Sequence, residues 1–126
     1  MRCLIVDDNA GFVAAARKLL EAGGMTVVGS ASSSVEAFDL VASLQPDVTL
    51  VDIDLGAENG IDLAERLHDS GAPSPVVLVS AYSADDFLES ITACGAAGFV
   101  PKSRLSASAI REVLEGSTGF EESDHR

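Results

Sequence analysis

Acidic, hydroxyl and amino side chains follow short apolar segments at four places in this 126-residue chain. Asp7 and Asp8 come directly after the first apolar segment, and Asp52 follows another. Ser80 comes directly after a later segment, and Lys102 follows the last one after a single proline. If these segments are parallel strands, their carboxyl ends meet at one edge of a sheet, where α/β proteins bind ligands. We therefore expect the five side chains to gather at that edge.

Three carboxylates at one place repel one another unless a cation joins them. A set of oxygen ligands without nearby His or Cys pairs favours a hard divalent ion, Mg²⁺ before Zn²⁺. Mg²⁺ usually binds one or two carboxylates together with phosphate oxygens, which indicates a phosphoryl substrate. A carboxylate can itself attack phosphorus and form an acyl phosphate. Lys102 would then neutralise a phosphoryl oxygen, and Ser80 would donate a hydrogen bond.

Five short apolar segments are predicted to be strands. Three of them are nearly continuous aliphatic runs without polar alternation, which is typical of parallel strands buried on both faces. The predicted strands are residues 3–6, 25–29, 48–53, 76–79 and 98–100.

Segments with helical spacing of apolar residues alternate with these strands. Capping residues precede four of the predicted helices, and a Gly or Pro ends each of the five. The predicted caps are Ser33, Asn59, Ser83 and Ser106, and the predicted stops are Gly23, Pro46, Gly71, Gly95 and Gly116. Five strand–helix units with short connections predict a parallel α/β sheet with helices on both faces.

Composition limits the remaining possibilities. Hydrophobic residues make up 47% of the chain and aromatic residues 5%, so we expect a single domain with an aliphatic core. The net charge of −12 argues against binding to nucleic acid or anionic lipid. No apolar run approaches the roughly 20 residues that span a bilayer, and the first residues do not resemble a signal peptide. Cys3 and Cys94 are expected to be buried thiols in a reducing cytoplasm.

Four segments together resemble the response-regulator receiver domain of bacterial two-component signalling. They are LIVDDN (4–9), PDVTLVDIDLGAENGIDLAERL (46–67), VVLVSAY (76–82) and GAAGFVPK (95–102), in the order and spacing of that family. The resemblance implies a doubly wound, flavodoxin-like sheet with strand order 2-1-3-4-5, as in chemotaxis receivers. We expect the receiver domain over residues 1–115 and a flexible acidic tail over 116–126.

The resemblance also implies roles for individual residues. Asp52 matches the aspartate that accepts a phosphoryl group, and Asp7 and Asp8 match the acidic pair that holds Mg²⁺. The backbone carbonyl of Asp54 matches the remaining protein ligand of the metal. Gly56 and the residue after it replace the Pro-Gly that relatives often carry, so the shape of this loop is not predicted.

The remaining matches concern the response to phosphorylation. Ser80 takes the position of the switch hydroxyl, and Lys102 takes the position of the motif lysine. Phe99 takes the position of the aromatic residue whose rotamer changes on phosphorylation. The resemblance implies a sensor histidine kinase or phosphotransfer protein as phosphodonor, and a downstream protein as target. It is compatible with a monomer or a weak dimer.

Two other functions fit parts of the sequence. Asp52 and Asp54 form the Asp-x-Asp pattern of haloacid dehalogenase-type phosphatases, but those enzymes carry it in the opening strand. A phosphate-independent interaction module would be indicated by loss of an acid or of Lys102, and neither is lost. We therefore expect no enzyme activity beyond the domain's own aspartyl phosphorylation and dephosphorylation.

Overall fold

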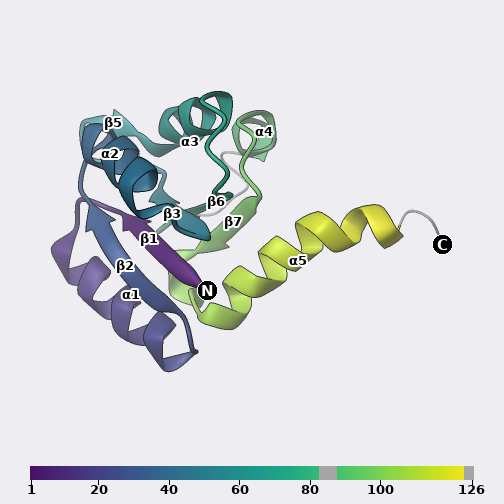
Figure 1. Ribbon diagram of the computed structural model, residues 1–126, viewed down its shortest axis with the longest axis horizontal. Coiled ribbons are helices and arrows are strands. Elements are labelled where there is room, and N and C mark those ends of the chain that lie inside the picture. Colours follow the sequence, from purple (N-terminus) through teal and green to yellow (C-terminus); the bar gives the residue numbers. More distant parts are fainter. Residues whose placement is uncertain (83–87, 124–126) are drawn as a thin grey trace.

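The computed structural model describes the backbone of residues 1–82 and 88–123. Its centre is a five-stranded parallel sheet in the order β2-β1-β3-β6-β7 (Figure 1). These strands are β1 (Arg2–Val6), β2 (Thr26–Ala31), β3 (Val48–Asp52), β6 (Val76–Ser80) and β7 (Gly98–Pro101). Counted along the chain, the order is 2-1-3-4-5, which confirms the predicted topology.

Helices cover both faces of the sheet. They are α1 (Ala10–Ala22), α2 (Ser34–Leu44), α3 (Gly60–Asp69), α4 (Leu88–Ala93) and α5 (Ala107–Ser123). In Figure 1, α2, α3 and α4 lie on one side of the sheet, and α1 and the start of α5 lie on the other. Two core clusters match this division, because one contains side chains of α2, α3 and α4 and the other those of α1 and α5.

Polar side chains begin the helices largely as predicted. Ser33, Asn59 and Ser106 each accept a hydrogen bond from a backbone amide in the first turn that follows. Asn9 caps α1 in the same way and was not predicted. The predicted cap Ser83 lies outside the described residues.

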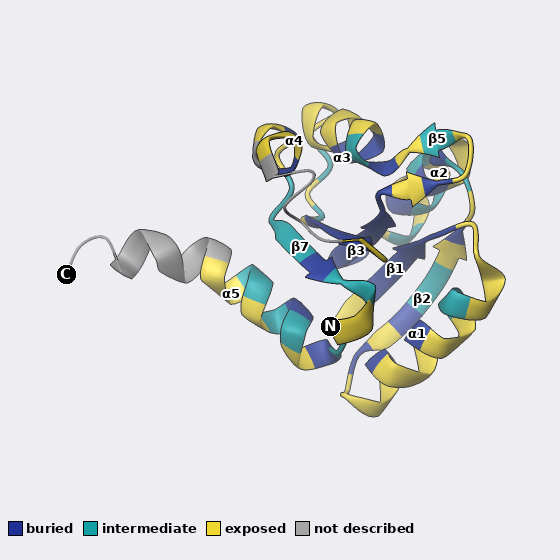
Figure 2. Cartoon of the chain, turned by 180° about the vertical axis from the view of Figure 1, so that it is seen from behind, coloured by how far each residue is buried: buried dark blue, intermediate teal, exposed yellow. Residues whose placement is uncertain are grey.

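The core is aliphatic, as the composition predicts. All described residues of β3 and β6 are buried, and Figure 2 shows the central strands in the colour of buried residues. Successive residues of β1 point to opposite faces, so Leu4 joins one cluster and Ile5 the other. Cys3 and Cys94 are buried free thiols, as predicted. Burial raises the pKa of Cys3 to about 12, so this thiol stays protonated at neutral pH.

Several predictions about the elements were wrong. The last helix continues past Gly116 to Ser123, because Gly116 does not adopt the positive φ that commonly ends a helix. Leu19 and Val35 fit the apolar stripes of their helices but are 51% and 71% exposed. A small antiparallel hairpin, β4 (Asp54–Leu55) with β5 (Glu58–Asn59), was not predicted. No helix of the described residues is long and apolar enough to cross a membrane.

Candidate phosphoacceptor site

An acidic pocket forms at the carboxyl ends of β1 and β3. The two strands are neighbours, and Val6 pairs with Val51, so the next residues, Asp7 and Asp52, lie side by side at this edge. One carboxylate oxygen each from Asp7, Asp8 and Asp52 lies within 4.8 Å of the others. The structure thus brings together the three acids that the sequence places at strand ends.

Asp7 and Asp52 are oriented by the same kind of local hydrogen bond. The backbone amide of Asn9 donates to Oδ1 of Asp7 at 2.8 Å, and the amide of Asp54 donates to Oδ1 of Asp52 at 3.2 Å. In each case the donor is two residues beyond the acid, as in an Asx turn. Each carboxylate is therefore oriented through Oδ1, which leaves Oδ2 for other partners.

Lys102 faces both of these Oδ2 atoms. It follows β7 in a short 3₁₀ turn (Lys102–Arg104), and its side chain crosses the edge of the sheet toward β1. Its Nζ lies 2.8 Å from Asp7 Oδ2 and 3.2 Å from Asp52 Oδ2. The ring of Phe12, from α1, has its centre 4.2 Å from the same ammonium. Phe12 also packs against the core cluster of α1 and α5, and its contact with Lys102 was not predicted.

The pocket changes the acidity of its residues. Burial raises the pKa of Asp52, the charge of Asp7 raises it further, and Lys102 opposes both, which leaves a pKa of about 6. Burial alone would lower the pKa of the Lys102 ammonium. The carboxylates of Asp7 and Asp52 outweigh that effect and hold its pKa above the ordinary value. Lys102 is thus charged at neutral pH and partly neutralises two acids.

These residues fit a hard divalent cation. The donors are all carboxylate oxygens, the set that Mg²⁺ prefers over softer metals. Oδ2 of Asp7 is buried and accepts no hydrogen bond of good geometry, although Lys102 lies beside it. Asp8 is exposed, so the pocket is open to an ion from solvent. Asp7, Asp8 and Asp52 would hold the ion.

The loop after Asp52 packs closely against the acids. Gly56 has a φ of +63°, and a Cβ at this position would lie 2.7 Å from Oδ2 of Asp8. A Cβ at Gly60 would lie 1.9 Å from the carbonyl oxygen of Asp52. Gly60 therefore has no room for a side chain, and the positive φ of Gly56 favours glycine there. The side chain of Asp54 is exposed, and Asp54 is one of the residues that line a cavity of about 240 Å³.

Ser80 lies at the edge where it was predicted, and Phe99 in the strand beside it. Ser80 ends β6, is 1% exposed, and accepts a hydrogen bond from the amide of Tyr82 at 3.0 Å. It lines the same cavity as Asp54. Phe99 is half-buried in β7 and packs against the core cluster of α2, α3 and α4. The switching roles of Ser80 and Phe99 stay predictions.

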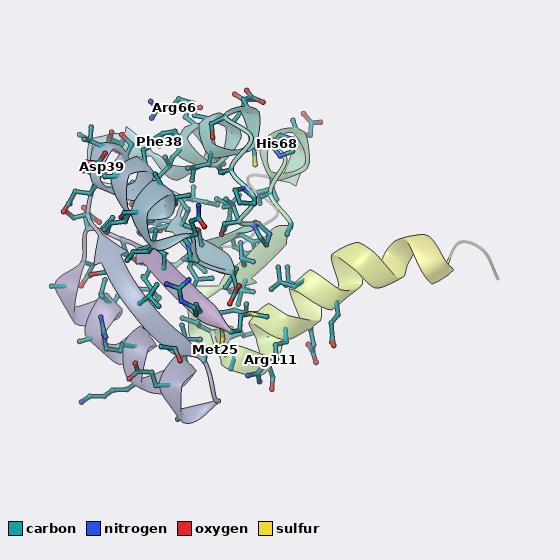
Figure 3. The ribbon with its side chains drawn as sticks, viewed as in Figure 1. Met25, Phe38, Asp39, Arg66, His68 and Arg111 are labelled. Atoms are coloured by element: carbon teal, nitrogen blue, oxygen red, sulfur yellow. The ribbon has the colours of Figure 1, made fainter. Side chains whose placement is uncertain are left out.

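His68 lies far from this chemistry in the fold. It is exposed, as its place on the polar side of α3 predicts, and Figure 3 shows it on the side of α3 nearest α4. Its neighbours are residues 72–75 and 95–97, which precede β6 and β7, and Val76, which begins β6. It is therefore at the opposite edge of the sheet from the acidic pocket.

Comparison with known proteins identifies the family that the chain resembles. Residues 3–115 match the response regulator receiver domain family. The chain is 30% identical over 124 residues to an uncharacterized transcriptional regulatory protein, YvfU, of Bacillus subtilis. It is 36% identical over 105 residues to a protein-glutamate methylesterase/protein-glutamine glutaminase of Hahella chejuensis. These matches cover 95% and 81% of this chain, but only 62% and 30% of the relatives.

A solved structure agrees with the sequence matches. The chain resembles a signal receiver domain from Mycobacterium tuberculosis with a TM-score of 0.80 and 28% identity. The alignment covers 94% of this chain and 96% of that domain. Together with the match over residues 3–115, this places the chain in the response regulator receiver domain family.

Proposed function

We propose that this domain accepts a phosphoryl group on Asp52, and that Mg²⁺ bound by Asp7, Asp8, Asp52 and the carbonyl of Asp54 supports the transfer. The observation that carries the proposal is the convergence of three carboxylates with the ammonium of Lys102. A pocket built only for stability would not bury Asp52 beside Asp7, because each acid raises the cost of ionising its neighbour.

The chain's own residues would act in a simple order. A carboxylate oxygen of Asp52 forms a bond to phosphorus while the bond between phosphorus and the donor's leaving group breaks. Lys102 gives up its pairing with Asp52 Oδ2 and pairs with an oxygen of the new phosphoryl group. When bound, Mg²⁺ supplies further positive charge against the phosphoryl oxygens. The amide of Asp54 keeps Asp52 in place throughout.

Phosphorylation then shifts the domain between two states. The new group adds close to two negative charges to the pocket, which favours a state with more donors around it. Ser80 would move toward the phosphoryl group, and Phe99 would follow into the space that becomes free. The surface of α4, β7 and α5 would change and control a downstream protein.

Partners follow from family membership and are part of the proposal. A sensor histidine kinase or phosphotransfer protein would supply the phosphoryl group in the cytoplasm, and the domain would act on no other substrate. The longer relatives carry the words transcriptional regulatory protein and methylesterase in their names. Either kind of output would be supplied outside the segment that the chain shares with them.

The test uses a small acyl phosphate with Mg²⁺ and intact-mass measurement. The wild-type protein should gain one phosphoryl group, and Asp52→Asn should gain none. Asp54→Asn is the matched control, since it removes a neighbouring charge but keeps the backbone carbonyl and should still be phosphorylated. An unmodified wild-type protein, or a phosphorylated Asp52→Asn protein, would refute the proposal. Steady turnover of a phosphomonoester would instead indicate a phosphohydrolase.

A further inference from the structure

The loop that follows Asp52 has little structure of its own. Its hairpin pairs Asp54 with Asn59 and Leu55 with Glu58, and each strand is two residues long. Even a longer isolated hairpin is only marginally stable in water. The loop nevertheless keeps Gly56 against Asp8, and in the proposed function it also supplies the carbonyl of Asp54 to the metal. Contacts from outside the hairpin must therefore hold it.

One such contact comes from the first residue of α2. Oε1 of Glu58 accepts from the amide of Ser34 at 2.9 Å, and Oε2 accepts from the hydroxyl of Ser34 at 2.5 Å. Ser34 is 5% exposed and Glu58 is half-buried, so these bonds lie at the partly exposed rim of the contact. Figures 1 and 2 both show β5 beside α2. The carboxylate thus joins two segments that lie 24 residues apart in the sequence.

The start of a helix suits this carboxylate for two reasons. The first amides of a helix have no partner within it, and the helix dipole favours negative charge there. The hydrogen bonds from Ser34, together with the positive charge of Arg66, lower the pKa of Glu58. Glu58 is therefore ionised at neutral pH and binds the start of α2 in its charged form.

We propose that Glu58 is a positioning residue that holds the 53–60 loop against Asp8 by binding the start of α2. This inference rests on the proposed function, because it explains how that loop keeps its place beside the metal ligands. Its consequence is that α2, which carries none of the three acids of the pocket, contributes to the affinity of the pocket for Mg²⁺. Glu58 itself would contact neither the ion nor the phosphoryl group.

Glu36 offers a matched control in the same helix. Its carboxylate accepts from the amide and the hydroxyl of Ser32, at 3.0 and 2.7 Å. Like Glu58, it accepts from the amide and the hydroxyl of one serine at the start of α2, but that serine is Ser32 and the bonds do not reach the 53–60 loop. A general weakening of α2 should follow from either substitution, whereas loosening of the loop should follow only from substitution of Glu58.

The experiment compares Glu58→Met and Glu36→Met in metal-free protein by amide hydrogen exchange. Glu58→Met should speed exchange over residues 54–60 on the order of tenfold, and Glu36→Met should affect only the start of α2. Glu58→Gln, which keeps one acceptor, should fall between wild type and Glu58→Met. In calorimetric titration, Glu58→Met should weaken Mg²⁺ binding about tenfold, the lower range for residues that support metal ligands.

Wild-type exchange over residues 54–60 in Glu58→Met, or an equal increase in Glu36→Met, would overturn the inference. Should Glu58→Met fail to fold, Glu58→Gln against Glu36→Gln decides the same question. A wild-type protein that binds no Mg²⁺ would overturn the metal in the proposed function. The exchange comparison would still decide the role of Glu58, because it is made without metal.

Discussion

Asp52→Asn should make the metal-free protein more stable at neutral pH. Asp52 is 4% exposed and lies beside the charge of Asp7, and its pKa is raised from 3.8 to about 6. The ionised carboxylate is therefore less stable in the folded protein than in the unfolded chain. Asparagine has nearly the same shape and can still accept from the amide of Asp54, but it carries no charge.

The size of the effect follows from the pKa. A rise of about two units corresponds to roughly 3 kcal/mol, since each unit is 1.36 kcal/mol. The pocket opens to solvent at Asp8, so screening reduces this value, and we expect about 1.5 kcal/mol. For a domain of this size that is an increase of roughly 5 °C in melting temperature.

The pH dependence has a definite sign. Between about pH 4 and 6 the folded protein holds a proton on Asp52 that the unfolded chain has lost, so acidification stabilises the wild type through this group. The penalty is complete above about pH 7 and absent below about pH 4. The advantage of Asp52→Asn should therefore be largest at about pH 7.5 and disappear near pH 4.

Thermal unfolding with a chelator present, followed by circular dichroism at both pH values, measures this difference. Asp39→Asn is the control, because it also removes one negative charge from this chain of net charge −12, but at an exposed site on α2. It should shift the melting temperature by less than Asp52→Asn. Equal melting temperatures of Asp52→Asn and wild type at pH 7.5, or a difference that persists unchanged at pH 4, would refute the reasoning.

Three further substitutions test the pocket. Lys102→Ala should still accept some phosphoryl but fail to switch, since no fixed cation then pairs with the new oxygens; wild-type-sized changes in amide shifts near Phe99 on phosphorylation would contradict this. Asp54→Ala should bind Mg²⁺ more weakly, because it removes a negative charge near the site. It should also be phosphorylated about fivefold faster by a small anionic phosphodonor at low salt, because the Asp54 carboxylate repels a phosphate at about 7 Å by roughly 1 kcal/mol at an effective dielectric near 40. The phosphorylation rates of Asp54→Ala and the wild type should converge near roughly 0.5 M salt, and equal rates at low salt would refute the repulsion by Asp54. Phe12→Leu keeps an apolar side chain but removes a cation–π contact of about 0.5–1 kcal/mol, so the Lys102 pKa measured by NMR titration should fall; an unchanged pKa would show that the ring only packs.

The strands were predictable because their burial leaves a signal in each one. β1, β3 and β6 are covered on both faces, so nearly every position is apolar and the runs stand out. The hairpin of β4 and β5 has no such signal, because two residues per strand show no periodicity. The end of α5 was missed for a different reason, since one glycine weakens a helix without necessarily ending it.

The acids of the site were predictable for a similar reason. Asp7 follows β1 and Asp52 ends β3, both strands are easy to recognise, and parallel neighbours bring their carboxyl ends together. The contacts of Phe12 with Lys102 and of Glu58 with Ser34 join residues far apart in the chain. Neither contact follows from a local pattern, because each depends on how a helix or loop packs after the sheet has formed.

The pocket combines strong local order with one replaceable contact. Asp7 and Asp52 are each oriented through Oδ1 by an amide two residues later, and neither of these bonds involves Lys102. Their Oδ2 atoms share Lys102, whose long side chain can take other rotamers. In the proposed function, an incoming phosphoryl group would displace this ammonium from Asp52, and the two Oδ1 bonds would keep both carboxylates in their orientation. Both acids follow the same local pattern, since each is followed two residues later by a residue whose backbone amide donates to its Oδ1 and leaves Oδ2 to Lys102.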